Sequence, residues 1–460
     1  MQNSDKKALF ETMPVKRAIA SMAIPTIISQ LINLIYNVVD TFFIGRTGNS
    51  YMVASVTVAY TLYIMTVSFG NLFGIGGGSL IARLIGRGEP ERAKNVASYS
   101  FYGAIVIALL YSLLIGTLCT PLLKLFGASG ETMGYAKQYL YTVVVAGDVP
   151  IILSAVVAHL LRNVGYSKQA SLGLSMGGVL NIALDPLFMF VLFPDGYEVF
   201  GAALATLIAN IIACVYLVCV YRKVSAKTSL SMAPAHARAL DAQDRKALYS
   251  VGVPSAILTG LFDLANIVLN AQMARYGDLQ LAALGIVMKA ERLPNAVNIG
   301  ICQGMLPIIA YNYSSGNRAR MREVIRTATV YGLAISFASM ALFEIFASPV
   351  MGVFLSTSGK NAEMAVKTLE FAVFFLRIRC LASPFQFMNY RSSFCMQAMG
   401  SGACTLIHAV VREIVFYIPF MYLLNALFGM TGLSCALIAG EGCGMLFAIF
   451  LMNYRMKLHE

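Results

Sequence analysis

About twelve long apolar runs divide this chain, each near or above the roughly 20 residues that a helix needs to cross a bilayer. Hydrophobic residues make up 58% of the 460 residues and charged residues only 12%, whereas soluble domains carry about 25% charged residues. Nothing alternates with the period of a strand, which excludes a closed barrel. We predict an all-α integral membrane protein with twelve transmembrane helices near residues 18–44, 53–82, 96–118, 138–161, 170–193, 200–220, 251–274, 281–313, 327–347, 368–390, 405–424 and 432–453.

The net charge is +12, and the positions of the basic residues along the chain predict the membrane topology. Basic residues concentrate in the loops that alternate helices place on one side, and few lie on the other side. This asymmetry predicts that both termini are cytoplasmic and that the surplus contacts anionic lipids, so no nucleic acid partner is expected. The first run lacks a cleavage site and is expected to be the first span. The nine cysteines form no CxxC pair, so they predict neither a metal site nor a disulfide framework. No cofactor is expected.

The two halves of the chain repeat each other at a spacing of about 229 residues. Each half holds six runs, an even number, which predicts two six-helix lobes related by a parallel internal repeat. Such repeats are typical of secondary transporters. We predict an N-lobe over residues 1–220, a cytoplasmic linker over 221–250 with a surface helix near 235–248, and a C-lobe over 251–460. The matching pairs include Pro25 with Pro254, Asn37 with Asn266, Arg46 with Arg275, and Gly76 with Gly304.

When the two halves are aligned, several polar residues of the first half match aliphatic residues of the second. An intramembrane carboxylate costs roughly 2.5–3.5 kcal/mol on insertion scales, so it marks a functional site by default. Since the twin position tolerates an aliphatic residue, packing alone does not require the polar one. The unmatched set is Asp40 against Leu269, Asn181 against Ile414, Asp185 against Ile418, and Thr206 against Leu437.

Helical spacing brings these groups onto common faces. Asn181 and Asp185 are four residues apart, and Pro186 frees a carbonyl one turn earlier. Counted at 1.5 Å per residue, Asp40, Asp185 and Thr206 lie roughly 9–15 Å from the outer surface. Their oxygens suit a proton or a hard cation such as Na⁺, with the two carboxylates titrating as a pair. A polar stripe on the first span, expected to bind or support substrate, comprises Gln30, Asn33, Tyr36 and Asn37.

Two alternatives stay open for the remaining polar residues. Asn33, Asn37 and Thr206 could instead hold helices together, which such side chains do for about 0.6 kcal/mol each. Asp263 forms a second stripe with Asn266 and Asn270 and is a candidate substrate contact. Asp148 has no assigned role. The other intramembrane charges could pair among themselves, namely Lys289, Glu291, Arg292, Arg377, Arg379, Arg412, Glu413 and Glu441.

Across essentially its whole length the chain resembles the multidrug and toxic compound extrusion (MATE) family. The resemblance is closer to the bacterial branches that couple through the N-lobe than to those that use an acid in span 7. The family's span 7 acid usually falls eight residues after the proline that matches Pro254, whereas Asp263 falls nine after it. The motifs that carry the resemblance are Ala23-Ile-Pro25, Tyr36-Asn-Val-Val-Asp-Thr-Phe-Phe-Ile-Gly45, Gly86-Arg-Gly-Glu-Pro-Glu-Arg92, Asn181-Ile-Ala-Leu-Asp-Pro186 and Gly304-Met-Leu-Pro-Ile-Ile-Ala-Tyr-Asn-Tyr313.

The resemblance implies roles for these residues. Asp40, Asn181, Asp185 and Thr206 match the family's proton and cation site, which would hold Na⁺ in a sodium-coupled member, and Pro25 matches the proline at which span 1 bends. Members export cationic, amphiphilic drugs and dyes in exchange for inward Na⁺ or H⁺. We expect such an antiporter, acting as a monomer by alternating access in the cytoplasmic membrane of a bacterium.

Three other functions are weighed against drug export. A flippase for lipid-linked oligosaccharides, from the same superfamily, predicts a cationic central cavity, which the arginines of spans 10 and 11 would supply. A membrane enzyme would need clustered catalytic groups, but the four histidines are dispersed, so the chain is not expected to be an enzyme. A channel fits poorly with a duplicated chain that buries carboxylates.

Overall fold

A computed structural model describes residues 8–354 and 362–457, and within these ranges the chain is helical and contains no strand. Nine helices in the described ranges are long and apolar enough to cross a membrane. A tenth crossing is the pair Gly130–Val145 and Asp148–Asn163, which is bent by 47°. The segment Gly402–Met456 passes that test as one helix, yet Gly429 breaks it at φ 59°, ψ −141°. α14 is not among the nine apolar helices, because charged residues interrupt its sequence.

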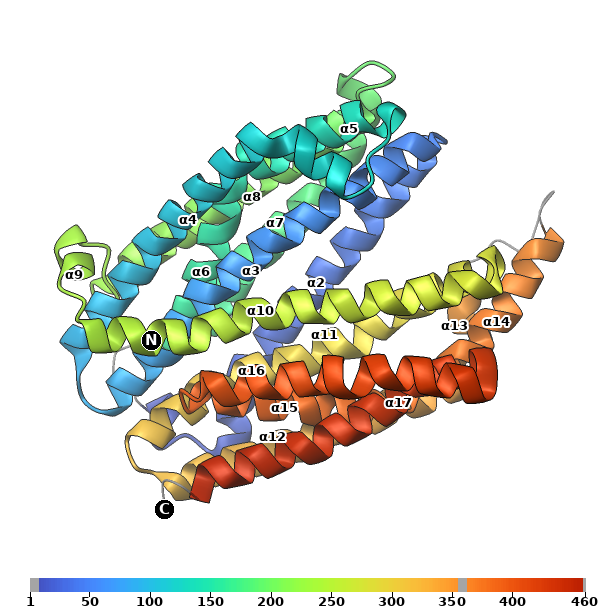
Figure 1. The fold of residues 1–460 in the computed structure, drawn as a ribbon. Coiled ribbons are helices and arrows are strands. Elements are labelled where there is room, and N and C mark those ends of the chain that lie inside the picture. The colour runs from blue at the N-terminus through green and yellow to red at the C-terminus, as the bar shows by residue number, and fades with distance from the viewer. Residues whose placement is uncertain (1–7, 355–361, 458–460) are drawn as a thin grey trace.

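The first six predicted spans form one lobe of the fold, the N-lobe. Its helices lie side by side in the blue-to-green half of the ribbon (Figure 1). They are α2 (Val15–Arg46), α3 (Ser50–Gly86), α4 (Pro90–Leu125), α5 (Gly130–Leu140) with the π-helical turn η1 (Tyr141–Val145), α6 (Asp148–Asn163), α7 (Ser167–Leu187) with the π-helical turn η2 (Phe188–Leu192), and α8 (Glu198–Ser225).

The C-lobe repeats this arrangement in the yellow-to-red half (Figure 1). It comprises α10 (Ala242–Met273) with the short η3 (Ala274–Tyr276), α11 (Asp278–Ser314), α12 (Arg318–Ile345), α13 (Ala347–Gly352), α14 (Ala362–Cys380), α15 (Ser383–Ala398), α16 (Gly402–Val410) with the π-helical η4 (Val411–Tyr417), and α17 (Ile418–Lys457). Both chain ends lie at the same end of the molecule, here called the terminal end (Figure 1). The lobes converge there and diverge toward the opposite end, where α5, α13 and α14 lie.

The predicted linker is more helical at its C-terminal side than expected. Only the short α9 (Pro234–Arg238) forms between the lobes. The single surface helix predicted near 235–248 is wrong, because Asp241 caps a new helix by accepting a hydrogen bond from the Asp244 N–H at 2.7 Å. Residues from Ala242 onward therefore belong to α10, which continues without interruption into span 7.

Glycines let the lobes touch backbone to backbone near the terminal end. A Cβ on Gly252 of α10 would lie 2.2 Å from the carbonyl oxygen of Leu72 on α3, and a Cβ on Gly76 would lie 2.7 Å from that of Leu248. A Cβ on Gly304 would likewise meet the backbone of α2 at 2.6 Å. Since any side chain at these positions would separate the helices, the α3–α10 contact forms a tight seam between the lobes.

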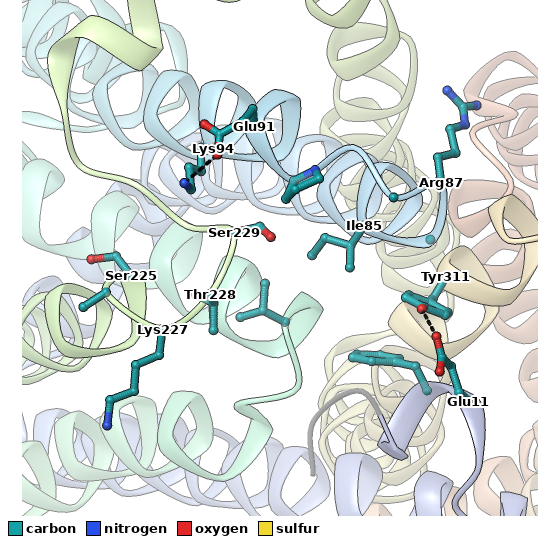
Figure 2. Close-up of a pocket in the computed structure, with 16 residues that line it drawn as sticks. Glu11, Ile85, Arg87, Glu91, Lys94, Ser225, Lys227, Thr228, Ser229 and Tyr311 are labelled. Carbon is teal, nitrogen blue, oxygen red and sulfur yellow. Dashed lines mark hydrogen bonds and ion pairs between the residues drawn. The ribbon is translucent and has the colours of Figure 1, made fainter. Parts of the chain in front are cut away.

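The N-terminal segment reaches across to the C-lobe and is held there. Arg320 at the start of α12 donates hydrogen bonds from Nε to the Phe10 carbonyl at 2.7 Å and from Nη2 to the Met13 carbonyl at 2.7 Å. The Phe10 ring stacks on Tyr311 of α11, with centroids 5.1 Å apart, and the Tyr311 hydroxyl donates to Glu11 (Figure 2). The segment before α2 thus packs on the lobe opposite to the one that α2 begins.

A second contact across the terminal end joins α4 to α10. Arg92 donates to both carboxylate oxygens of Asp244, at 2.9 and 2.8 Å, and also pairs with Glu89. A hollow of about 980 Å³ opens beside these contacts, between the start of α4, residues 225–229 and Tyr311 (Figure 2). Together with the glycine seam, these contacts close the terminal end between the lobes.

Candidate functional site

Three polar residues of α7 and α8 form a hydrogen-bonded cluster inside the N-lobe. The Asn181 side-chain amide donates from Nδ2 to Thr206 Oγ1 at 3.0 Å and to Asp185 Oδ1 at 3.3 Å. All three residues are buried, with exposed fractions of 2% for Asn181, 0% for Asp185 and 6% for Thr206. The predicted spacing of four residues on one helical face therefore brings Asn181 and Asp185 together, with α8 supplying the hydroxyl.

Asp40 approaches this cluster from α2. It lines a cavity of about 210 Å³, here called the central cavity, together with Thr206, Tyr36 and Asn37. Its carboxylate lies within electrostatic range of the Asp185 carboxylate. Three helices thus place two carboxylates, an amide and a hydroxyl around one region, as their sequence positions predict.

The cluster has more acceptor oxygens than donors. Asp40 Oδ1, Asn181 Oδ1 and Asp185 Oδ2 are buried and accept no hydrogen bond from any described residue. A buried polar atom without a partner costs roughly 1–3 kcal/mol, and more when it is charged. Because all three atoms are acceptors, a proton or a hard cation would satisfy them, whereas an anion would not. This set of oxygen ligands therefore fits H⁺ or Na⁺.

The predicted stripe on α2 divides between two places. Tyr36 and Asn37 line the central cavity, and Asn33 lines an adjoining cavity of about 250 Å³ within the N-lobe that also reaches Asn181. Gln30 lies elsewhere, since its Nε2 donates to Gln303 of α11 at 3.3 Å and so bridges the lobes. The stripe therefore supplies side chains both to the cavity and to the lobe contact.

Two further predicted residues lie away from the cluster. Asp263 lines a second cavity of about 280 Å³, which shares Tyr60 with the central cavity but is mostly walled by the C-lobe, including Arg412 and Glu413. Pro25 sits within α2, which stays helical from Val15 to Arg46; its role as a hinge remains a prediction. The structure thus does not bring Asp263 to the Asp40 site.

Most other intramembrane charges pair with one another. Asp148 accepts a hydrogen bond from Thr66 Oγ1 at 2.7 Å, inside the N-lobe. Arg379 donates to both oxygens of Glu291, at 2.8 Å each. Arg412 contacts Glu441 at 2.7 Å and Glu413 at 3.3 Å, while Arg377 lies 4.0 Å from Glu344. The Arg379–Glu291 and Arg412–Glu441 pairs offset the cost of burying their charges, so these pairs have a structural explanation. Arg377 is exposed, and the Asp148 Oδ2 atom accepts no hydrogen bond from a described residue.

Three tyrosines of the central cavity were missed by the sequence reasoning. Tyr60 and Tyr63 of α3 and Tyr139 of α5 line the central cavity beside Tyr36. The spacing of Tyr60 and Tyr63 places them on one helical face, a signal that could have been used. Nothing in the local sequence marks Tyr139, which arrives through the packing of α5 on α3. Aromatic faces of this kind attract organic cations.

A bilayer-length helical protein with two repeated lobes and a polar cluster inside one lobe has the architecture of a secondary transporter. The profile of the MatE family matches residues 25–187 and 254–423 of this chain. The chain therefore belongs to the MATE family of transporters and is a multi-pass membrane protein. MATE transporters are not, in general, enzymes.

Full-length relatives agree with this assignment. The chain is 28% identical to "Multidrug export protein MepA" of Staphylococcus aureus (strain MRSA252), over 96% of this chain and 94% of that protein. It is 27% identical to the MepA of Staphylococcus saprophyticus, over 98% and 97%.

Solved structures share the fold. "Crystal structure of MATE in complex with MaL6" superposes with a TM-score of 0.91 at 22% identity, covering 98% of each chain. An outward-facing multidrug resistance MATE family transporter of the MOP superfamily superposes with a TM-score of 0.90 at 21% identity, covering 100% of this chain and 99% of that one.

Proposed function

We propose that this protein exports amphiphilic organic cations in exchange for H⁺ or Na⁺. Support comes from the full-length likeness to multidrug export proteins and from the polar cluster of the N-lobe. The distribution of basic residues favours both termini in the cytoplasm of a bacterium. The terminal end would then face inward, and the structure would be the outward-facing state.

The observation that carries this proposal is the set of unpaired acceptor oxygens on Asp40, Asn181 and Asp185. Drug export against a gradient needs a site where the coupling ion changes the protein's affinity for drug. Asp40 meets that need, because it borders the central cavity and lies within electrostatic range of Asp185. An ion bound at the cluster therefore changes the electrostatic potential in the cavity.

The exchange follows from charge. With the carboxylates ionised, the central cavity offers Asp40 and four tyrosine rings to an organic cation. H⁺ or Na⁺ entering from outside cancels one of the two negative charges and weakens the attraction for the organic cation, which leaves through the end away from the termini. By linkage, bound drug must weaken ion binding by the same factor. The ion-loaded protein then opens at the terminal end, releases the ion and takes up the next drug.

Ethidium efflux from proteoliposomes tests this proposal, with Na⁺ and pH gradients imposed in turn. Asp40→Asn should abolish gradient-driven efflux, because the neutral amide carries no negative charge with which to bind and release H⁺ or Na⁺. Asp195→Asn serves as the control, since Asp195 is an exposed acid of the loop between η2 and α8. Efflux that still follows either gradient in Asp40→Asn would contradict the proposal.

The flippase alternative loses its main support. It requires a cationic central cavity, for which the arginines of spans 10 and 11 were the candidates. Arg379 is bonded to Glu291 and Arg412 to Glu441, so carboxylates balance these charges within the C-lobe. The basic residues that do border the central cavity, Lys289 and Arg292, share it with the Asp40 carboxylate. The cavity is therefore not uniformly cationic, and drug export is the function that we propose.

A further inference from the structure

Two basic residues of the C-lobe line the same cavity as Asp40. Lys289 and Arg292 lie on α11, which belongs to the opposite lobe, and both line the central cavity. They are three residues apart and so share one face of the helix. The cavity is thus bordered by a carboxylate on the N-lobe side and by two cations on the C-lobe side.

These two cations differ from the other intramembrane bases of the C-lobe. Arg377, Arg379 and Arg412 each lie within 4.0 Å of a carboxylate, whereas Lys289 makes no ion pair or hydrogen bond with any described residue. Arg292 has only the longer-range field of the Asp263 carboxylate. Both side chains are exposed to the cavity rather than buried. A charge at membrane depth without a structural partner indicates a ligand.

Packing does not account for Lys289. Its side chain is exposed, while its neighbour Ala290 is buried against the C-lobe core together with Val287 and Leu284. An aliphatic residue would satisfy the same helix, as it does at many exposed positions of this chain. The ammonium therefore needs an explanation outside the protein's own contacts.

We propose that Lys289 and Arg292 form an anion subsite, and that the central cavity accepts zwitterionic amphiphiles as well as cations. The cationic group of such a substrate lies toward Asp40 and the tyrosines, and its carboxylate, sulfonate or phosphate lies toward Lys289. Arg292, one turn along the helix, adds a second positive charge that attracts the same acidic group. This inference rests on the proposed drug export and specifies a substrate class for it.

The test compares two dyes that differ by one carboxylate: rhodamine B, a zwitterion at neutral pH, and its ethyl ester, a cation. Fluorescence polarisation with the purified full-length protein gives the Kd of each. Lys289→Gln should weaken rhodamine B binding by about tenfold, through the loss of one charge-assisted hydrogen bond in a cavity open to water. The ester should bind unchanged or more tightly. Lys124→Gln, at an exposed lysine of α4 outside the cavity, should leave both dyes unaffected.

The outcomes separate this inference from the proposal beneath it. If Lys289→Gln changes the two dyes by the same factor, Lys289 acts on the cavity as a whole, for example as a counter-ion of Asp40, and the anion subsite is refuted. No change with either dye refutes it as well. If the wild-type protein binds neither dye and does not export ethidium, drug export itself fails, and the anion subsite fails with it.

Discussion

Replacing Gly252 by alanine should shift the protein away from the conformation described here. The added Cβ would lie 2.2 Å from the Leu72 carbonyl oxygen, whereas ordinary contact begins near 3.4 Å, so the helices must separate by about 1.2 Å. Both partners are helical backbone, which no change of rotamer can move. Overpacking of this kind costs typically about 1–3 kcal/mol.

The cost applies only while the seam between α3 and α10 is closed. A conformation in which the lobes part at the terminal end avoids the clash entirely. The equilibrium should therefore move toward that conformation by about 5-fold to 150-fold. Gly260→Ala is a matched control on the same helix, because nothing lies within 4 Å of a Cβ built there.

Double electron–electron resonance can measure this shift. Spin labels at Lys124→Cys on α4 and Lys367→Cys on α14 report the distance between the lobes at the end away from the termini. The background should lack the accessible native cysteines. Gly252→Ala should populate a shorter distance at that end, while Gly260→Ala should match the wild type. If Gly252→Ala keeps the wild-type distances, or only lowers the melting temperature, the clash is relieved locally and the reasoning is refuted.

Three further substitutions test an ion pair, a set of hydrogen bonds and a backbone conformation described above. Arg412→Met should lower stability by about 3–5 kcal/mol because it leaves Glu441 and Glu413 buried without their cation; thermal unfolding should show a clear loss, and Arg412→Met combined with Glu441→Met should recover much of it. Arg320→Gln removes hydrogen bonds to three carbonyls of the N-terminal segment, so amide hydrogen exchange over residues 8–13 should accelerate, with exchange in α8 unchanged. Gly429→Ala should cost about 1–3 kcal/mol, because φ 59°, ψ −141° is a conformation nearly confined to glycine; an unchanged melting temperature would contradict this.

The sequence predicted the fold because a bilayer leaves few choices. Apolar runs of bilayer length must be helices, and the repeat of Pro25 at Pro254 indicated two lobes. It predicted less well where a local cap decides the outcome. Asp241 starts α10 earlier than the apolar run suggests, because its side chain satisfies the Asp244 N–H, a choice that hydropathy does not register.

The candidate site was foreseen where it depends on spacing within one helix. Asn181 and Asp185 meet because they are four residues apart, and Thr206 was found through its aliphatic twin. Contacts between helices distant in sequence were not foreseen. Tyr139 reaches the central cavity only through the tertiary packing of α5, and Gln30 points to Gln303 because α2 packs on α11.

Helix α2 is attached to both lobes. Asp40 lies near one of its ends, against the N-lobe cluster, while the residues just before its other end are held by Arg320 and Asn312 of the C-lobe. Parting the lobes at the terminal end must therefore either strip this anchor from the C-lobe or flex the helix between its two attachments, where Pro25 lies. In the exchange proposed above, a change of charge at Asp40 would therefore reach the contact between the lobes at the terminal end through this one helix.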